Sequence, residues 1–177
     1  MDLDINFVRN QFPAFSENSL KSKAFFENAG GSYTCGQVIN RLNRFYKEKK
    51  VQPYGAFEAS ISGGNEMDEA RVGLARYLGV KECEVSFGPS TTQNTYVLAQ
   101  AFAEWLVPGN AIIVTNQDHE ANTGSWRRLY NKGVNVREWQ VDKETGELNL
   151  EDLETLLDDN VKLVCFPHCS NIVAHIN

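Results

Sequence analysis

The stretch EVSFGPSTTQNTYVLAQAFAEWLVPGNAIIVT, residues 84–115, decides the fold of this chain. It begins with a short apolar run that predicts a strand, which Pro89 ends because proline cannot donate to a strand ladder. Residues 91–106 then predict a helix, and residues 111–115 predict a buried strand after it. A helix of this length between two strands is the kind of connection that parallel strands need. The stretch therefore predicts two parallel strands joined by a crossover helix.

The same alternation continues on both sides of this stretch. Residues 65–78 predict a helix that Asn65 caps and Gly79 ends. Downstream, the pattern predicts a helix around 123–131, a strand at 134–141, a helix at 150–158 capped by Asn149, and a strand at 161–166. We therefore expect an α/β fold with a mainly parallel sheet and helices on both of its faces.

The N-terminal part lacks this alternation. It contains a glycine-bearing loop at 25–34, an amphipathic helix at 35–50 with Val38, Leu42 and Phe45 inward, and a long irregular stretch at 51–65. We expect residues 1–64 to form an N-terminal segment and residues 65–177 to form the first part of a larger domain, incomplete at its C-terminus. A loop as long as 51–65 in a compact domain is often functional or contacts another subunit.

Composition narrows the classes of partner. The formal net charge is -6 and no basic stripe is present, which argues against a nucleic-acid partner. No apolar run could span a membrane and the first residues have no signal-peptide core, so we expect a cytoplasmic protein with no membrane partner. The four cysteines are expected to be free thiols. Because Cys165, His168 and Cys169 lack the spacing of a zinc site, we expect no metal.

Three polar clusters each follow a predicted strand directly. They are GPSTT at 88–92, NQDHEAN at 116–122 and PHCSN at 167–171. Ligands of open parallel sheets bind beyond the carboxyl ends of the strands. We therefore expect the three clusters to face one crevice.

The first cluster is a candidate phosphate site. Ser90, Thr91 and Thr92 stand at the first turn of a predicted helix, where backbone N–H groups and the helix dipole favour an anion. Their hydroxyls would complete a phosphate cup. The simpler alternative is that Ser90 or Thr91 only caps the helix.

His119 is the candidate of the second cluster. At the end of a strand it can stack on a flat ligand or transfer protons, whereas the alternative is a solvated loop histidine. Asp118, His119 and Glu120 do not indicate a metal site, because adjacent residues of an extended segment point to opposite faces.

Asparagines and glycines supply the remaining candidates. Asn171 can donate to the phenolate oxygen of a ligand, or it can simply shape a turn. In the N-terminal loop, Asn28, Gly30 and Gly31 either form a tight turn or let the backbone approach a substrate closely.

The order of four motifs is more specific than any one of them. FFENAGGS at 25–32, FGPSTTQNT at 87–95, DHEANTGSW at 118–126 and HCSNIVAHIN at 168–177 together resemble the class V aminotransferase family, and most of all its cysteine desulfurase-like subgroup. This resemblance implies the N-terminal part of the large domain of a fold-type I pyridoxal-phosphate enzyme. It also implies pyridoxal 5'-phosphate as cofactor, a small amino-acid substrate and a homodimer.

The resemblance assigns roles by position. Ser90, Thr91 and Thr92 match the loop that holds the cofactor phosphate, His119 matches the catalytic, ring-stacking histidine, Asn171 matches the asparagine that binds the phenolic oxygen, and Asn28, Ala29 and Gly30 match the loop beside the substrate. Two positions depart from the family pattern. Asn94 stands where desulfurases commonly have glycine, and Glu120 stands where many have a second histidine or a lysine.

Covalent capture of the cofactor is expected from a complementing C-terminal part. The family places its pyridinium-binding aspartate, Schiff-base lysine and substrate-carboxylate arginine after the asparagine motif, which implies positions beyond Asn177. None of the nine lysines of this sequence matches that lysine. Carbon–sulfur cleavage is the first reaction to expect, and transamination, epimerisation and β-elimination stay open.

Two other classes of function remain. One is a truncated, non-catalytic relative, which would leave a sheet edge unpaired and would associate unless a partner covers it. The other is a Rossmann-like module that binds a phosphate or a nucleotide. The sequence has neither a GxGxxG fingerprint nor a Walker loop, which argues against that module.

Overall fold

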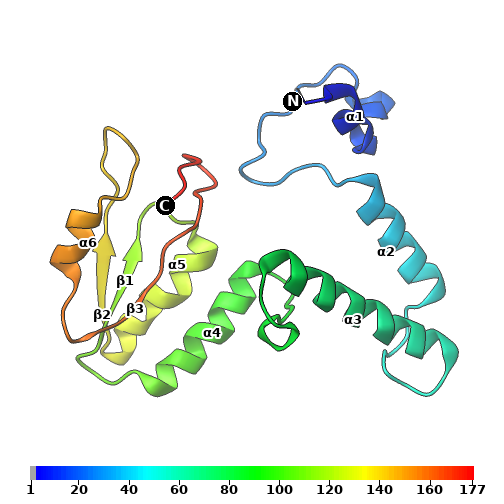
Figure 1. Cartoon of the computed structure of the whole chain (residues 1–177). Helices are drawn as coiled ribbons and strands as arrows, with labels where there is room; N and C mark the ends of the chain where they lie inside the picture. Colours follow the sequence, from blue (N-terminus) through cyan, green and yellow to red (C-terminus); the bar gives the residue numbers. More distant parts are fainter. Residues whose placement is uncertain (1–2) are drawn as a thin grey trace. The chain divides into compact units, whose positions relative to one another are not determined.

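The computed structural model describes residues 3–177, which divide between Ser86 and Phe87 into two compact units. The first unit contains α1 (Ile5–Asn10), short 3-10 turns at Pro13–Ser16 and Asn18–Leu20, α2 (Gly36–Glu48), α3 (Glu58–Leu78) and a 3-10 turn at Glu82–Glu84 (Figure 1). The second contains α4 (Thr91–Trp105), β1 (Ala111–Thr115), α5 (Glu120–Arg127) with a 3-10 turn at Arg128–Lys132, β2 (Asn135–Trp139), α6 (Leu150–Leu156) and β3 (Val161–Val164).

The second unit confirms the predicted parallel sheet. Its strands lie in the order β2-β1-β3, and β1 pairs in parallel with both neighbours. Figure 1 shows α6 on one side of the strands and α4 and α5 on the other. The α4 side is apolar, with Ile112 and Val114 packed into the core, whereas on the α6 side Arg137 donates to the carbonyl of Leu156 at 2.5 Å. Helices therefore cover both faces, as the alternation of elements predicted.

The core between the sheet and the two helices is built from β1, α4 and α5. Its buried members are Ala99, Leu106, Ile112, Val114, Trp126, Leu129 and Val134. Every residue of β1 is buried, because this central strand has paired strands on both edges and helices over both faces. The edge of the Trp126 ring meets Phe102 of α4 with ring centroids 5.6 Å apart. This contact holds α5 against α4.

The prediction of a strand at residues 84–88 is wrong. Glu82–Glu84 forms a 3-10 turn instead, closed by the Glu84 carboxylate, which accepts from the backbone N–H of Lys81 at 2.7 Å. Val85 is extended, but no strand among residues 3–177 pairs with it. An extended apolar run forms a β-strand only where the backbone of another strand can hydrogen-bond to it.

The helix predicted from Asn65 begins earlier, at Glu58. Two adjacent glycines at 63 and 64 look like helix breakers, but both are buried within α3. A Cβ atom at Gly64 would lie 2.7 Å from Cδ1 of Tyr54, so the glycine makes room for the tyrosine ring. The predicted end at Gly79 is confirmed, with φ of 70° in the left-handed region.

The stretch before α3 is consequently a folded turn, shorter than the irregular stretch predicted at 51–65. Ser60 is fully buried, and its hydroxyl donates to the carbonyl of Gln52 and accepts from the N–H of Gly55. Tyr54 takes a left-handed conformation with φ of 64°, and its hydroxyl donates to Asp68 at 2.9 Å. The separate roles of residues 1–64 and 65–177 stay a prediction.

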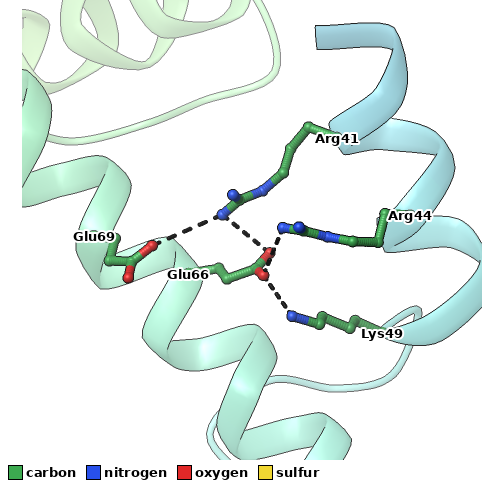
Figure 2. A network of polar contacts seen from close by, with 5 residues as sticks. All are labelled: Arg41, Arg44, Lys49, Glu66 and Glu69. Carbon is green, nitrogen blue, oxygen red and sulfur yellow. Dashed lines mark hydrogen bonds and ion pairs between the residues drawn. The ribbon is translucent and has the colours of Figure 1, made fainter. Parts of the chain in front are cut away.

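The face of α2 turned toward α3 is the charged one. Glu66 of α3 accepts from Lys49 at 2.5 Å and pairs with Arg44 at 3.0 Å and Arg41 at 3.1 Å (Figure 2). Of the three side chains predicted to face inward, Val38 and Leu42 are 46% and 52% exposed, whereas Phe45 is half-buried. The prediction that these two side chains face inward is therefore wrong for the described residues, because ion pairing determines which face meets α3.

We expect Glu66→Gln to lower the free energy of unfolding by about 1 kcal/mol at neutral pH, the upper range for a partly exposed ion pair. The hydrogen bond from Lys49 holds the pKa of Glu66 below its usual range. A carboxyl whose pKa is lowered by folding contributes stability above its unfolded pKa, and that contribution is lost as the pH falls through the folded pKa. Part of the acid loss should therefore disappear in the variant.

Urea unfolding from neutral pH down into the acid range measures both effects of the Glu66 change. Glu69→Gln is the matched control, because Glu69 is 76% exposed on its side chain and lies 3.9 Å from Arg41. Equal acid losses in the wild type and in Glu66→Gln would contradict the expectation.

Candidate functional site

The N-terminus of α4 presents the predicted phosphate residues. Ser90 is extended and its hydroxyl accepts from the N–H of Gln93 at 3.2 Å, so Ser90 does cap the helix. Thr91 and Thr92 form the exposed start of the first turn, where the N–H groups have no carbonyl within the helix to bond. Capping by Ser90 and binding of an anion by the two threonines are compatible, since they use different N–H groups.

The loop before α4 is shaped by Gly88 and Asn94. The Asn94 side chain folds back over the loop so closely that a Cβ atom at Gly88 would lie 1.7 Å from its Oδ1. Asn94 is the position where the family pattern has glycine. The amide therefore occupies space beside the candidate phosphate site that a glycine would leave open.

His119 is the N-cap residue of α5. Its Nδ1 accepts from the N–H of Ala121 at 2.9 Å, so the neutral imidazole carries its proton on Nε2. Asp118 accepts from the N–H of His119 at 2.7 Å and also from the side-chain amide of Asn122. The helix consequently begins at Glu120 and not near residue 123, because these two side chains cap it. The ring is exposed and held in orientation.

Asn171 lies on a turn that follows β3 and that Ser170 holds. The Ser170 hydroxyl accepts from the N–H groups of Ile172 and Val173, and Ser170 is only 3% exposed. The same hydroxyl donates to the carbonyl of Gln117 at 3.2 Å. The turn that carries Asn171 is therefore bonded to the loop that carries His119.

Two of the three predicted clusters are thus brought together within the second unit. The loops after β1 and β3, with His119 and Asn171, meet at the carboxyl edge of the sheet. α4 and α5 both run back along the sheet from that edge, so Thr91 and Thr92 start a helix on the same side. The expectation that the first cluster follows a strand is wrong, because residues 84–88 are unpaired.

The substrate-side residues belong to the first unit. Ser32 donates to the side-chain oxygen of Asn28 at 3.2 Å, and the N–H of Gly31 bonds the Asn28 carbonyl at 3.3 Å. Gly31 has φ of 151°, which glycine adopts readily. The segment is therefore a tight turn, and the roles of Asn28, Ala29 and Gly30 toward a substrate stay a prediction.

Cys165, on the chain just after β3, is not a reactive thiol. Burial raises the pKa of Cys165 to about 12, and the negative charge of Asp118 adds to that rise. The thiol is therefore protonated at neutral pH and a poor nucleophile. Among residues 3–177, no three His, Cys, Asp or Glu side chains are placed to hold a metal ion, and no helix is long and apolar enough to cross a membrane.

Sequence reasoning missed Gln117. This glutamine is 7% exposed, and its side-chain amide donates to the carbonyl of Gly146 at 2.8 Å. Its position two residues after a fully buried strand is the available signal. The pattern could not reveal its partners, because they lie far away in the sequence.

Comparisons with known proteins extend over the whole chain. A sequence model of the family described as Aminotransferase class-V matches residues 24–177. An aminotransferase-like protein, FGM3 of Gibberella zeae, is 35% identical over 98% of this chain and 43% of its own length. A cysteine desulfurase of Serratia proteamaculans is 29% identical over 100% of the chain and 45% of its own length. The chain therefore spans less than half the length of these relatives.

Solved structures show the same fold. The apo structure of a cysteine desulfurase from Thermococcus onnurineus NA1 superposes with a TM-score of 0.85 at 23% identity, over 99% of this chain and 42% of that one. The cysteine desulfurase CsdA from Escherichia coli gives a TM-score of 0.81 at 19% identity, over 99% of this chain and 44% of that one. The architecture is therefore that of the N-terminal part of these proteins.

Proposed function

The chain belongs to the class V aminotransferase family, and from this premise we propose that it forms part of a pyridoxal 5'-phosphate pocket in an enzyme that acts on an amino acid. The observation that carries the proposal is the hydrogen bond from Ser170 to the carbonyl of Gln117 at 3.2 Å. It joins the loop of His119 to the turn of Asn171 at the ligand-binding edge of a parallel sheet. Relatives named cysteine desulfurase and aminotransferase-like protein support the same assignment.

The residues present fit the chemical groups of this cofactor. The exposed first turn of α4 suits a phosphate, because Thr91 and Thr92 offer two N–H groups and two hydroxyls at the positive end of a helix. The exposed imidazole of His119, oriented by its bond from Ala121, suits the face of an aromatic ring. Asn171 has an amide that can donate to a phenolic oxygen.

The bound cofactor would supply an electron sink for the bonds of an amino acid. The groups of this chain would bind and orient it: Thr91 and Thr92 hold the phosphate, His119 covers one ring face, and Asn171 keeps the phenolic oxygen hydrogen-bonded. Because Nδ1 of His119 accepts from Ala121, its Nε2 proton would be the one to donate during the reaction. We propose carbon–sulfur cleavage as the first candidate reaction, because a similar protein is named cysteine desulfurase. Transamination is the alternative.

We also propose where the remaining groups come from. The Schiff-base lysine, the pyridinium-binding aspartate and the substrate-carboxylate arginine would be contributed by residues outside this sequence, either from a C-terminal part or from a complementing chain. A homodimer in the cytoplasm, with Asn28, Ala29 and Gly30 beside the substrate, belongs to the same proposal.

We expect the chain to bind pyridoxal phosphate, and the double variant Thr91→Ala/Thr92→Ala to bind it at least about tenfold more weakly, since bonds to a charged group contribute about 1.5–3 kcal/mol each. Titration followed by visible absorbance measures the affinity. Thr155→Ala is the matched control, because Thr155 is an exposed threonine on α6. Equal affinities of the double variant and the control would refute the phosphate site.

The same titration separates the alternatives. Borohydride reduction followed by peptide mass spectrometry should give no specific lysine adduct, and a single modified lysine would overturn the proposal that the lysine lies elsewhere. An absence of any binding would favour a non-catalytic relative. Tighter binding of ATP or NAD than of pyridoxal phosphate would favour a nucleotide-binding module.

A further inference from the structure

Gln117 is a buried polar side chain that links three separate segments of the second unit. Its amide nitrogen donates to the carbonyl of Gly146 at 2.8 Å, and its amide oxygen accepts from the side chain of Asn177 at 2.7 Å. Its backbone carbonyl accepts from Ser170 at 3.2 Å. Among residues 3–177, no buried side-chain nitrogen or oxygen atom lacks a hydrogen-bond partner, and this includes the amide of Gln117.

The bonds of Gln117 close the loop that follows β3. Asn177 bonds back to the carbonyls of His168 and Pro167, and Cys169 pairs with Ile176 in an isolated bridge. Residues 167–177 therefore form a closed loop whose two ends meet beside Gln117. The turn with Asn171 lies at the middle of this loop and gains its orientation from the closure.

The other end of the arrangement is His119, two residues after Gln117. The N–H of Gln117 donates to the hydroxyl of Thr115 at 3.0 Å, which fixes the chain as it leaves β1. Gln117, Ser170 and Thr115 are buried, so moving Gln117 would leave buried polar groups without their partners. A displacement of Gln117 would therefore move the His119 loop and the Asn171 turn relative to each other.

We infer that Gln117 is a positioning residue that sets the spacing between the His119 ring and the Asn171 amide, and so determines how tightly a flat ligand with a phenolic oxygen is held. This inference rests on the proposed function for the identity of the ligand. The geometric part, the coupling of Gln117 to the Asn171 turn, does not depend on it.

The test uses Gln117→Met in the full chain, which keeps the length of the side chain and removes its two side-chain hydrogen bonds, to Gly146 and Asn177, while the backbone bonds of residue 117 remain. In the cofactor-free protein, NMR should show the side-chain and backbone amide signals of Asn171 shifted, although the two residues are far apart in the sequence. In a titration with pyridoxal phosphate, the affinity should fall by about tenfold, as expected for the loss of two part-buried hydrogen bonds.

Two controls separate positioning from a general loss of stability. Gln140→Met makes the same change at an exposed glutamine near the end of β2. Ile113→Val lowers stability by about 0.5–1.5 kcal/mol through a fully buried residue of β1. Both should leave the Asn171 signals and the affinity within about twofold of the wild type.

Each outcome decides something specific. Unmoved Asn171 signals in Gln117→Met would overturn the coupling, and an unchanged affinity would overturn the positioning role. An equal loss of affinity in Ile113→Val would reduce Gln117 to a structural residue. If the wild type binds no pyridoxal phosphate, the proposed function fails, while the NMR comparison still decides the coupling.

Discussion

Trp126→Ala should lower the free energy of unfolding by about 3–5 kcal/mol, the largest single effect we expect in this chain. Trp126 is 3% exposed and packs edge-on against Phe102 of α4. Its removal leaves a cavity where α4 and α5 meet, and the surrounding backbone can fill such a cavity only in part. Because the two helices carry Thr91, Thr92 and His119 at their N-termini, we also expect the affinity for pyridoxal phosphate to fall.

Chemical denaturation followed by circular dichroism measures the loss of stability. The matched control is Trp105→Ala, which removes the same side chain from α4 at a position that is 61% exposed. Trp105→Ala should lower the free energy of unfolding by only about 1 kcal/mol or less, because the removed side chain is mostly exposed. Similar costs for the two alanine variants would mean that the contact between α4 and α5 does not hold the unit together.

His119→Ala should weaken pyridoxal phosphate binding by about tenfold and lower the free energy of unfolding by about 1 kcal/mol. The two losses have different causes, since the ring offers a stacking face and its Nδ1 caps α5 through the N–H of Ala121. The affinity is measured by absorbance titration and the stability by urea unfolding.

His119→Asn separates these two causes. Asparagine is a favourable N-cap residue but has no aromatic ring, so the stability should recover while the affinity stays low. If His119→Asn binds the cofactor as the wild type does, the imidazole is a cap and not a stacking surface. If His119→Asn is as unstable as His119→Ala, the capping role is wrong instead.

Much of the candidate site was predictable because parallel topology follows from local patterns. The apolar run AIIVT at 111–115 predicts a buried strand, and the structure has one there. Asn149 caps α6 as predicted, because its side chain accepts from the N–H of Glu151. Once strands and helices alternate, the residues after each strand must gather at one edge. The alternation by itself therefore assigns His119 and Asn171 to one site.

The errors share a different cause, which is dependence on a distant partner. The run at 84–88 has the composition of a strand but no ladder, and the glycines at 63 and 64 continue a helix because Tyr54 packs against one of them. The charged face of α2 meets Glu66 of α3. An amphipathic pattern alone would place that charged face outward. In each case the deciding contact comes from residues that the local pattern does not include.

The amino-acid sequence by itself determined the class of fold, the family, and which side chains stand at the ends of strands and helices, because these follow from periodicity, caps and motifs within a few residues. Only the tertiary structure decided that the buried Gln117 joins Gly146, Ser170 and Asn177 into one hydrogen-bonded network. A buried amide must satisfy its hydrogen bonds, and it does so with whatever segments the fold brings to it. The geometry between His119 and Asn171 is consequently a property of that network.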